Sequence, residues 1–525
     1  MQGVMNALKG PGTQELFGRE QQNAIAGELS EHAGINVYPA SICLANGRLF
    51  ALARDGRARR FIVLARRGQS SPFDGPDGTR RSPVVGGEQL ELALVAPTHD
   101  AATRLRQLLP WTAPRMCGPK LSAGLGDRLG LATPGHVRAV TGTGCFPFFA
   151  QQSIREMTRT RRTPDQVMDD ATWGVFQAGW REGFGSDADH LKTTADIDAT
   201  DAVGFTMFTI DPGDHVRGDA DAMDASALSA AMDALPWSDL EISPADLRKR
   251  YLGRPMTLSG GGQIALDDQM LARAAAKYAA AIAHTVRMFR HLKDRRGSRP
   301  FELEVSVDET ATPTTVQEHY LIAAELKRLG VHWASLAPRF VGAFEKGIDY
   351  RGNLDQFERT YLQHIAVACT LGPYKLSLHS GSDKFSIYPI VAEWSGGMVH
   401  LKTAGTSYLE ALRVVARRSP VLFRRVLDFA FERFEDDRAS YHISARLENL
   451  PRPESLADEA LEGVLDTNDG RQLLHVTYGS VLTGTTADGR PRFRDDLRAV
   501  LIDHEEEHYA VVAEHLARHV QPFAR

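Results

Sequence analysis

The sequence predicts an α/β fold, a (β/α)8 barrel of the TIM type, with an N-terminal α/β region, a helical insertion and a helical C-terminal extension. Short apolar runs alternate with helix-like segments, which is typical of βα units in a parallel sheet. Eight such runs follow one another from about residue 121 onward. Most of them end in polar or charged residues, as barrel strands do at the face that carries an active site.

The eight strand-like runs set the expected order of the barrel. The first four cover residues 125–136, 146–156, 183–193 and 203–214, and the last four cover 301–310, 331–340, 374–384 and 398–406. The interval from 214 to 300 is too long for one βα connection. It ends in the Ala-rich segment DDQMLARAAAKYAAAIAHTVRMFRHLK, which is typical of a barrel helix. We therefore expect a helical insertion after the fourth strand, near residues 214–265.

Two flanking parts complete the predicted domain organisation. Residues 1–120 contain strand-like runs such as RRFIVLARR, and a strand followed by a helix at LELALVAPTHDAATRLRQLL, which predict a small α/β region. Thr98 or Asp100 is the expected cap of that helix. Residues 121–450 form the predicted barrel domain and include a strand-like run, YHISARLE, at 441–448. Residues 451–525 form the helical C-terminal extension.

Composition and charge exclude several classes of protein. Of 525 residues, 43% are hydrophobic and 24% are charged, and the formal net charge of -5 provides no basic field for nucleic acid. The sequence contains no run of about 18 apolar residues, so we expect no segment that spans a membrane. The four cysteines are scattered, as expected of free thiols in a reducing compartment, and the N-terminus lacks the apolar core of a secretory signal. We expect a cytoplasmic protein with no nucleic-acid or membrane partner, and a homo-oligomer is compatible with the sequence.

Residues 374–408 carry the strongest functional signal. Alternation of polar and apolar side chains in YKLSLH places Lys375 and His379 on one face of a strand. The same alternation in MVHLKT places His400 and Lys402 together. Buried charges without partners are costly. Strand faces of this kind are therefore expected to line a site that holds an anion or a metal ion.

Carboxylates, histidines and cations gather at the ends of several predicted strands. Carboxylate and imidazole groups together suit a divalent metal such as Mn, Zn, Ni or Co. Lysine and arginine suit a carboxylate or phosphate on a substrate. Ion pairs inside the barrel are the alternative for any single one of these residues. The candidate metal ligands are His190, Asp308, His379 and His400, and the candidate catalytic groups are Asp211, Glu309, Lys375 and Lys402.

Candidates for substrate binding lie in the loops that follow the strands. SGSDK follows the seventh run and TAGTS follows the eighth, where barrels often bind phosphate through backbone N–H groups. Glycines that simply turn the chain are the alternative. The substrate-binding candidates are Lys192, Arg339, Ser380, Ser382, Lys384 and Thr406.

Two short motifs are interpreted as structural. Residues 124–130 are GLGDRLG, which is GxGxxxG rather than the GxGxxG of dinucleotide-binding loops, so we expect no nicotinamide cofactor. Residues 504–508 are HEEEH, which fits the H-E-x-x-H pattern of zinc peptidases. The neighbouring glutamates indicate a solvated helix face instead. His515 and His519 continue that face, and we expect them to be exposed.

Long stretches of the sequence resemble the tagaturonate/fructuronate epimerase family of bacterial hexuronate metabolism. The similar segments run from about residue 120 to 450; they are GDRLGLATPGH, QQSIREMTRT, DADHLKT, FTMFTIDPGDHV, ELEVSVDET, SLAPRFVGAFEKGIDYRG, YKLSLHSGSDKFSIYP and HLKTAGTSYLEALR. The resemblance implies a metal-dependent epimerase, an isomerase that interconverts D-tagaturonate and D-fructuronate. It also implies that neutral ketohexoses, tagatose and fructose, are substrates of some relatives.

The chemistry of this epimerisation constrains the residues. The inverted carbon, C4, is next to neither the C2 ketone nor the carboxylate, so removal of an α-proton cannot invert it. Two routes remain. One is transient oxidation by a nicotinamide cofactor, and the other is retro-aldol cleavage of the C3–C4 bond through an enediolate. Without a dinucleotide fingerprint we favour the retro-aldol route. In our hypothesis, Asp308, His379 and His190 bind the metal, with His400 as fourth ligand. Asp211 or Glu309 is the general base. Lys375, Lys402 and Arg339 bind the developing oxyanion or the substrate carboxylate.

Two alternatives stay open from the sequence. The first is a sugar-phosphate aldolase or isomerase on the same barrel, which the SGSDK loop allows. The second is a non-catalytic sugar-acid binding protein, which explains the number of ionisable residues at strand ends poorly. Fold alone does not decide among them.

Overall fold

The predicted barrel is confirmed. The computed structural model of the protein describes residues 2–8, 17–69, 73, 79–85 and 88–524. Within these residues, eight parallel strands close into a barrel in the order β10-β11-β14-β15-β16-β17-β8-β9. The strands are Ser122–Gly124 (β8), Phe146–Ser153 (β9), Gly185–Leu191 (β10), Met207–Ile210 (β11), Glu302–Val307 (β14), Ser335–Pro338 (β15), Lys375–Leu378 (β16) and Val399–Lys402 (β17).

The first barrel strand lies earlier than the sequence predicted. Residues 122–124 form β8, whereas the expected run 125–136 forms a loop and then the start of helix α4 (Thr133–Val140). The Asp127 carboxylate accepts hydrogen bonds from the backbone N–H groups of Leu129, Gly130 and Ala132. These bonds bend the backbone into a loop where the sequence predicted an extended strand. Each of the other seven runs contains its strand.

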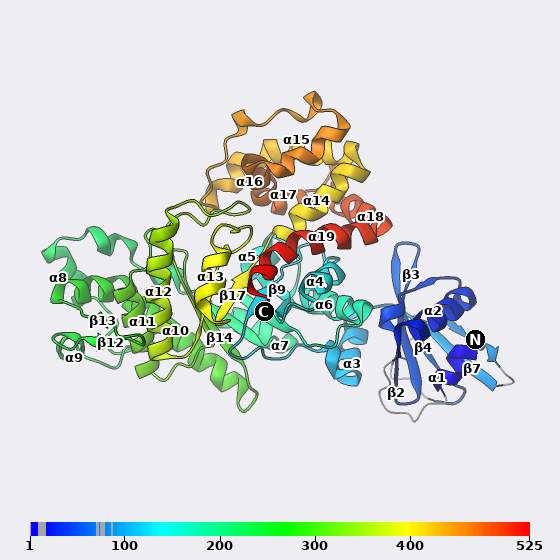
Figure 1. Ribbon diagram of the computed structural model, residues 1–525, viewed down its shortest axis with the longest axis horizontal. Coiled ribbons are helices and arrows are strands. Elements are labelled where there is room, and N and C mark those ends of the chain that lie inside the picture. Colours follow the sequence, from blue (N-terminus) through cyan, green and yellow to red (C-terminus); the bar gives the residue numbers. More distant parts are fainter. Residues whose placement is uncertain (1, 9–16, 70–72, 74–78, 86–87, 525) are drawn as a thin grey trace.

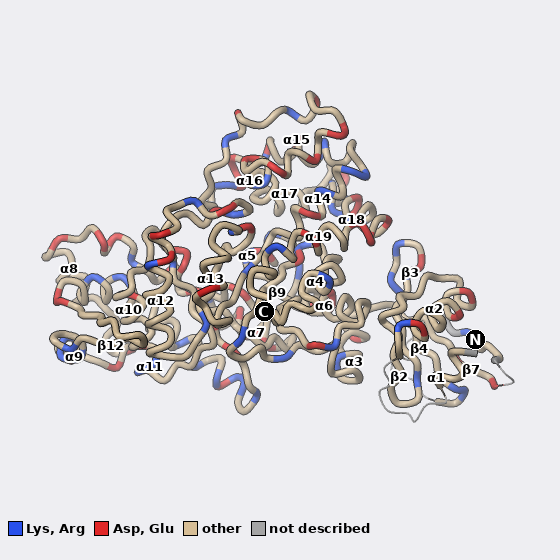
Figure 2. The backbone as a smooth tube through the Cα atoms, viewed as in Figure 1, with Lys and Arg blue, Asp and Glu red and all other residues tan. Residues whose placement is uncertain are grey.

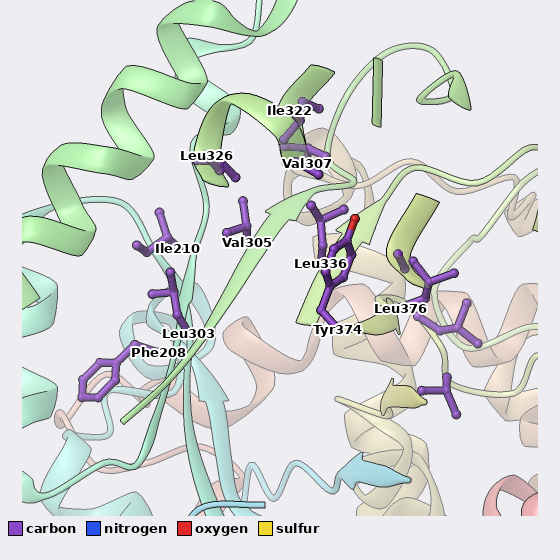
Figure 3. Packing of buried hydrophobic residues seen from close by; sticks show 14 of the residues in the cluster. Phe208, Ile210, Leu303, Val305, Val307, Ile322, Leu326, Leu336, Tyr374 and Leu376 are labelled. Atoms are coloured by element: carbon purple, nitrogen blue, oxygen red, sulfur yellow. The ribbon is translucent and has the colours of Figure 1, made fainter. Parts of the chain in front are cut away.

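Alternation along β14 shows how the barrel strands separate two environments. Leu303, Val305 and Val307 point outward and pack with other apolar residues beneath helix α11 (Val316–Arg328) (Figure 3). Glu304 and Ser306 therefore point into the barrel, where they meet polar side chains of other strands. The apolar shell closes the barrel, and the interior carries the ionisable groups.

Helices follow the strands and cover the outside of the barrel (Figure 1). Most of them begin at a side-chain cap that the sequence supplies; for example, the Ser153 side chain accepts a hydrogen bond from the Glu156 backbone N–H. These helices are α4, α5 (Ile154–Thr160), α6 (Pro164–Ala178), α7 (Thr194–Val203), α10 (Asp268–Arg296), α11, α12 (Leu354–Leu371), α13 (Tyr388–Ser395) and α14 (Thr406–Arg418).

The insertion after β11 is mostly helical, as predicted, but it also contains a small hairpin. It holds the 3-10 turns Gly213–His215 and Gly218–Ala222, helices α8 (Ala225–Asp233) and α9 (Pro244–Tyr251), and strands β12 (Met256–Thr257) and β13 (Gln263–Ile264). The hairpin strands pair antiparallel around Gly260 and Gly261, whose positive φ values of 96° and 92° suit a tight turn. The insertion projects from the barrel at the left of Figure 1.

The N-terminal region forms an antiparallel sheet with flanking helices, at the right of Figure 1. Its long strands are β3 (Arg48–Asp55), β4 (Ala58–Arg66) and β7 (Glu88–Val95). The shorter elements are α1 (Gln2–Leu8), α2 (Arg19–Ala33), β1 (Asn36–Val37), β2 (Cys43–Ala45), β5 (Thr79–Arg81) and β6 (Val84–Val85). Helix α3 (His99–Leu108) follows β7, and the Thr98 side chain caps it as expected.

A layer of helices lies over the barrel and shares one apolar core (Figure 1). It consists of α14, α15 (Pro420–Asp437), α16 (Asn468–Val476), α17 (Tyr478–Thr483), α18 (Arg494–Asp503) and α19 (Glu505–Val520). The run at 441–448 is a loop with a 3-10 turn, not the predicted strand. The backbone N–H groups of Ser444 and Arg446 donate to the side chains of Glu345 and Asp469, which occupies the bonds that a strand would need. Division of the chain at residues 120 and 450 stays a prediction.

Helix α19 corrects the interpretation of the HEEEH segment. Glu506 is exposed and Glu505 and Glu507 are partly exposed, but His508 and His519 are buried, and His515 is nearly so. The helix packs against α4 and α14, and this contact faces the histidines inward. Burial lowers the pKa of His508 to about 4, although the Asp127 carboxylate opposes the shift. Burial likewise lowers the pKa of His136, on α4, to about 4.

Charges of both signs are interspersed over the described chain (Figure 2). No part of the backbone in that view carries a long run of one sign. Within the described residues, no helix is long and apolar enough to cross a membrane.

Acid should weaken the packing of α19 on α4. A buried neutral histidine binds fewer protons than the unfolded chain does, so the free energy of unfolding falls as pH decreases from about 6.5 to about 4. His508→Leu should reduce this fall, because one such histidine is removed. Urea unfolding of both proteins at a series of pH values measures the effect, and equal slopes would contradict it.

Candidate active site

Two carboxylates of β10 and one of β14 surround one buried lysine. Lys402 Nζ, at the end of β17, lies 3.0 Å from Asp187 Oδ2, 2.6 Å from Asp189 Oδ1 and 2.7 Å from Glu304 Oε1. Burial disfavours the Lys402 charge, but the carboxylates raise its pKa well above the ordinary value. Burial and the neighbouring carboxylates raise the pKa of Asp187 to about 6 against the pull of Lys402. One cation is thus shared by an excess of negative groups.

Two histidines beside this cluster are each oriented by a carboxylate. His190 Nδ1 lies 3.0 Å from Asp211 Oδ2, and His379 Nδ1 lies 3.2 Å from Asp308 Oδ1. The two imidazole rings meet edge to face, with centroids 5.1 Å apart. A carboxylate on one imidazole nitrogen fixes the ring and increases the basicity of the other nitrogen. Asp211 and Asp308 therefore orient the rings of His190 and His379.

The Nε2 atoms of both histidines face the carboxylate cluster. His190 Nε2 lies 3.7 Å from Asp189 Oδ1, and His379 Nε2 lies 2.5 Å from Glu304 Oε1. Ligand atoms of Asp189, His190 and His379 lie within 4.8 Å of one another. Burial opposes the charge of His190, but Asp189 and Asp211 raise its pKa to about 10. Groups that attract protons so strongly also fit a divalent cation.

A cavity of about 270 Å³ opens beside His379. Its lining includes Asp308, Glu309 and His379 together with the aromatic rings of Phe340 and Phe344. A narrower recess next to it reaches Asp189, His190 and Lys402. The cavity therefore connects open space with the charged cluster in the barrel.

Three cations also line the cavity: Arg155, Arg339 and Lys346. Arg155 Nη2 pairs with Glu309 Oε1 at 2.8 Å. Among the residues that the structure describes, Arg339 and Lys346 pair with no carboxylate. Lys346 Nζ donates only to Ser380 Oγ, at 2.6 Å. Positive charge is thus available to an anionic group of a ligand.

Seven of the fourteen predicted site residues meet at this place. Asp308, Glu309, Arg339, His379 and Ser380 line the cavity. His190 and Lys402 line the recess beside it.

Lys375 and His400 lie deeper in the barrel than the sequence suggested. Lys375 Nζ donates to Ser122 Oγ at 3.0 Å, and His400 Nδ1 lies 2.9 Å from the same oxygen. Residues that point into a barrel from one strand step about 6 to 7 Å along it with every second position. Lys375 is therefore far below His379, and His400 lies one layer below Lys402. We leave both out of the proposed site.

Four predicted substrate-binding residues are used elsewhere. Lys384 Nζ is buried, and it donates to the backbone carbonyls of Glu345, Ile348 and Ser382. Burial lowers the pKa of Lys384 to about 7. Ser382 is buried in the loop after β16, and Thr406 is buried at the first position of α14. Lys192 pairs on the surface with Asp214 at 2.7 Å. None of these four side chains lines the cavity.

Sequence reasoning missed several residues of the cavity, among them Arg155, Lys346 and Tyr441. Arg155 follows the end of β9, where strand-end position was a usable signal. Lys346 lies in the long loop after β15, and Tyr441 lies in the loop that enters from the helical layer. Only packing of the helical layer on the barrel brings Tyr441 to the site, so no local pattern could have indicated it.

The glycine-rich segment at 124–130 is shaped by packing. A Cβ atom on Gly130, whose φ is 71°, would lie 2.0 Å from Asp170 Oδ2. The backbone N–H groups of Leu129 and Gly130 already donate to Asp127. The loop therefore lacks the free donors that a phosphate-binding turn presents.

Comparison with known proteins decides the family. A family model described as tagaturonate epimerase matches residues 38–523 of the chain. The chain belongs to the tagaturonate epimerase family. The match extends beyond the barrel into the N-terminal region and the helical layer.

Individual relatives of the tagaturonate epimerase family agree with this assignment. A tagaturonate/fructuronate epimerase from Thermotoga maritima is 42% identical over 487 residues, which is 93% of this chain and 96% of the relative. Crystal structures of a fructuronate-tagaturonate epimerase from Cohnella laeviribosi superpose with a TM-score of 0.86 at 36% identity. They cover 96% of this chain and 99% of the Cohnella chain.

Removal of the shared cation should destabilise this epimerase-family barrel strongly. Lys402→Met leaves Asp187, Asp189 and Glu304 buried without their partner, so we expect a loss of about 3 to 5 kcal/mol. Lys192→Met removes an exposed ion pair and should cost less than about 1 kcal/mol. Urea unfolding of both variants tests this, and equal losses would show that Lys402 is not the critical counter-ion.

Proposed function

We propose that the protein is a metal-dependent epimerase that interconverts D-tagaturonate and D-fructuronate. The observation that carries the proposal is the pair of carboxylate-oriented histidines beside a cavity with unpaired cations. This arrangement can hold both a divalent metal and an anionic sugar. Membership of the tagaturonate epimerase family supports the same reaction.

Asp189, His190 and His379 would hold the metal. They offer two imidazole nitrogens and a carboxylate oxygen within 4.8 Å of one another. Mn, Ni, Co and Zn all accept such ligands, so the residues do not select among them. When bound, the metal supplies a Lewis acid that polarises the substrate carbonyl. This set keeps two of the ligands expected from sequence and gives Asp308 the role of orienting His379.

Arg339 and Lys346 would bind the carboxylate of the sugar acid. Both line the cavity, and neither pairs with a carboxylate among the described residues. Hydrogen bonds from charged donors to a carboxylate are roughly twice as strong as neutral ones. A uronate is therefore bound with its acid group at the cationic wall and its ketone toward the histidines.

Glu309 would move the proton of the C4 hydroxyl. Inversion at C4 requires cleavage and re-formation of the C3–C4 bond, so a base must take this proton and return it. Glu309 lines the cavity and is partly exposed there. Burial opposes its ionisation, but His190 and Arg155 lower its pKa, which keeps it ionised and able to accept a proton. Asp211, the other base candidate, is held by His190 and does not line the cavity.

A sugar-phosphate aldolase or isomerase is the weaker alternative. Lys384 is the cation of the SGSDK loop, and its ammonium group donates to three backbone carbonyls. It therefore has no donor left for a phosphate. A cytoplasmic location and a homo-oligomeric state stay predictions.

Removal of metal should abolish turnover reversibly. We expect chelator-treated protein to stop converting D-tagaturonate and to regain activity with Mn, Ni, Co or Zn, because the Lewis acid is restored. Product formation measured by chromatography gives the result. Undiminished turnover in metal-free protein, with metal content measured by mass spectrometry, would contradict the proposal.

Loss of either metal-binding histidine should remove both metal and activity. His190→Ala and His379→Ala are each expected to lower turnover at least about a hundredfold. His291→Ala is the control, because His291 pairs with Asp198 at the surface. The assignment fails if either site variant keeps full metal content and activity.

A further inference from the structure

Two loops form the wall of the cavity that carries Lys346. The first follows β15 and contains Lys346, and the second follows β16 and contains Ser380. The two loops meet where Lys346 Nζ donates to Ser380 Oγ at 2.6 Å. A lysine has a long flexible side chain, so its position depends on how firmly the backbone beneath it is held.

Arg471, on helix α16, holds both loops at once. Its Nε donates to the backbone carbonyl of Gly347 at 2.7 Å, one residue beyond Lys346. Its Nη2 donates to Asp383 Oδ2 at 2.9 Å, three residues beyond Ser380. The guanidinium is buried, and its remaining arm donates to Glu410 Oε1. One rigid fork therefore fixes the distance between the two loops.

Asp383 is itself locked from the other side by helix α19. His515 Nε2 lies 2.5 Å from Asp383 Oδ1, and the Asp383 backbone N–H donates to His519 Nε2 at 2.9 Å. Burial disfavours the Asp383 charge, but Arg471 and the two histidines hold its pKa well below the usual range. Asp383 adopts a φ of 59°, a left-handed conformation that surrounding contacts must maintain. This buried network touches neither Asp308 nor the other groups around the metal ligands.

We propose that Arg471 is a positioning residue that sets the preference of the site for sugar acids over neutral ketohexoses, by holding Lys346 against the cavity. The inference rests on the proposed function and adds to it the origin of its specificity. Lys346 meets the carboxylate of a uronate, whereas a neutral ketohexose has no group that needs this charge. Disturbance of Arg471 therefore affects the uronate selectively.

Arg471→Lys is the sharpest probe of this role. Lysine keeps the charge but cannot donate to Gly347 and Asp383 in the fixed geometry of a guanidinium fork. We expect kcat/KM for D-tagaturonate to fall about tenfold, mainly through a higher KM, because charge-assisted hydrogen bonds lose strength when misaligned. The value for D-tagatose should change less than about twofold. The metal-loaded full-length protein is used throughout.

Arg424→Lys is the matched control. Arg424 belongs to the same helical layer and also bridges a backbone carbonyl and a carboxylate, those of Pro453 and Asp458. It contacts neither cavity loop, so the ratio of the two kcat/KM values should stay as in the wild type. An equal change in both arginine variants would reveal general loosening of the layer and would overturn the proposal.

A double-variant cycle separates positioning from a merely structural effect. Lys346→Met alone should lower the preference for D-tagaturonate over D-tagatose, and Arg471→Lys added to it should lower that preference no further. Calorimetric binding of the two sugars gives the same comparison without turnover. The proposed function fails if the wild type converts neither sugar. The positioning role fails if the wild type shows no binding preference for the uronate, or if the two variants reduce it additively.

Discussion

The barrel interior depends on the charge balance around Lys402. Three buried carboxylates share this one ammonium group, and a fully buried cluster of that composition keeps a net negative charge. The cost of desolvating such groups is large unless cations compensate them. Although burial opposes their charge, the neighbouring carboxylates raise the pKa of both His190 and His379, which favours the charged forms and supplies part of the compensation, and a divalent metal would supply it more completely. If the proposed metal site is correct, metal affinity and stability of the barrel arise from the same excess of carboxylate.

The site is completed by parts of the chain that are not barrel. The strands supply the histidines and carboxylates, because their inward faces are polar and their outward faces apolar. The helical layer supplies Tyr441 to the cavity and holds the loops after β15 and β16 through Arg471. A barrel alone would present reactive groups without a fixed wall opposite them. In the proposed positioning role of Arg471, selection among similar sugars depends on the layer more than on the strands.

The sequence was sufficient for the barrel and for part of the site, for physical reasons that differ by residue. Period-two alternation is local, so it located seven of the strands and placed His379 and Lys402 on inward faces. Strand β8 was missed because Asp127 bends the chain through side-chain bonds that no hydropathy pattern encodes. Depth along a strand also escaped prediction: Lys375 and His379 share one face, yet only His379 reaches the cavity. Arg471 and Tyr441 were not predicted, because contacts between distant segments bring them to the site.

The contact between His515 and Asp383 joins residues 132 positions apart in the chain. A ribosome adds roughly 5 to 20 residues per second, so the loop after β16 waits on the order of ten seconds for its anchor. Once residue 402 has been added, early in that interval, the nascent chain contains every barrel strand and every residue of the proposed metal site. Its left-handed Asp383 has no histidine partner, and α19 has not yet covered α4. Assembly of the cavity wall that carries Lys346 is thus a late event in biosynthesis, and chains that terminate before α19 would carry every residue of the proposed metal site beside an unfinished cavity.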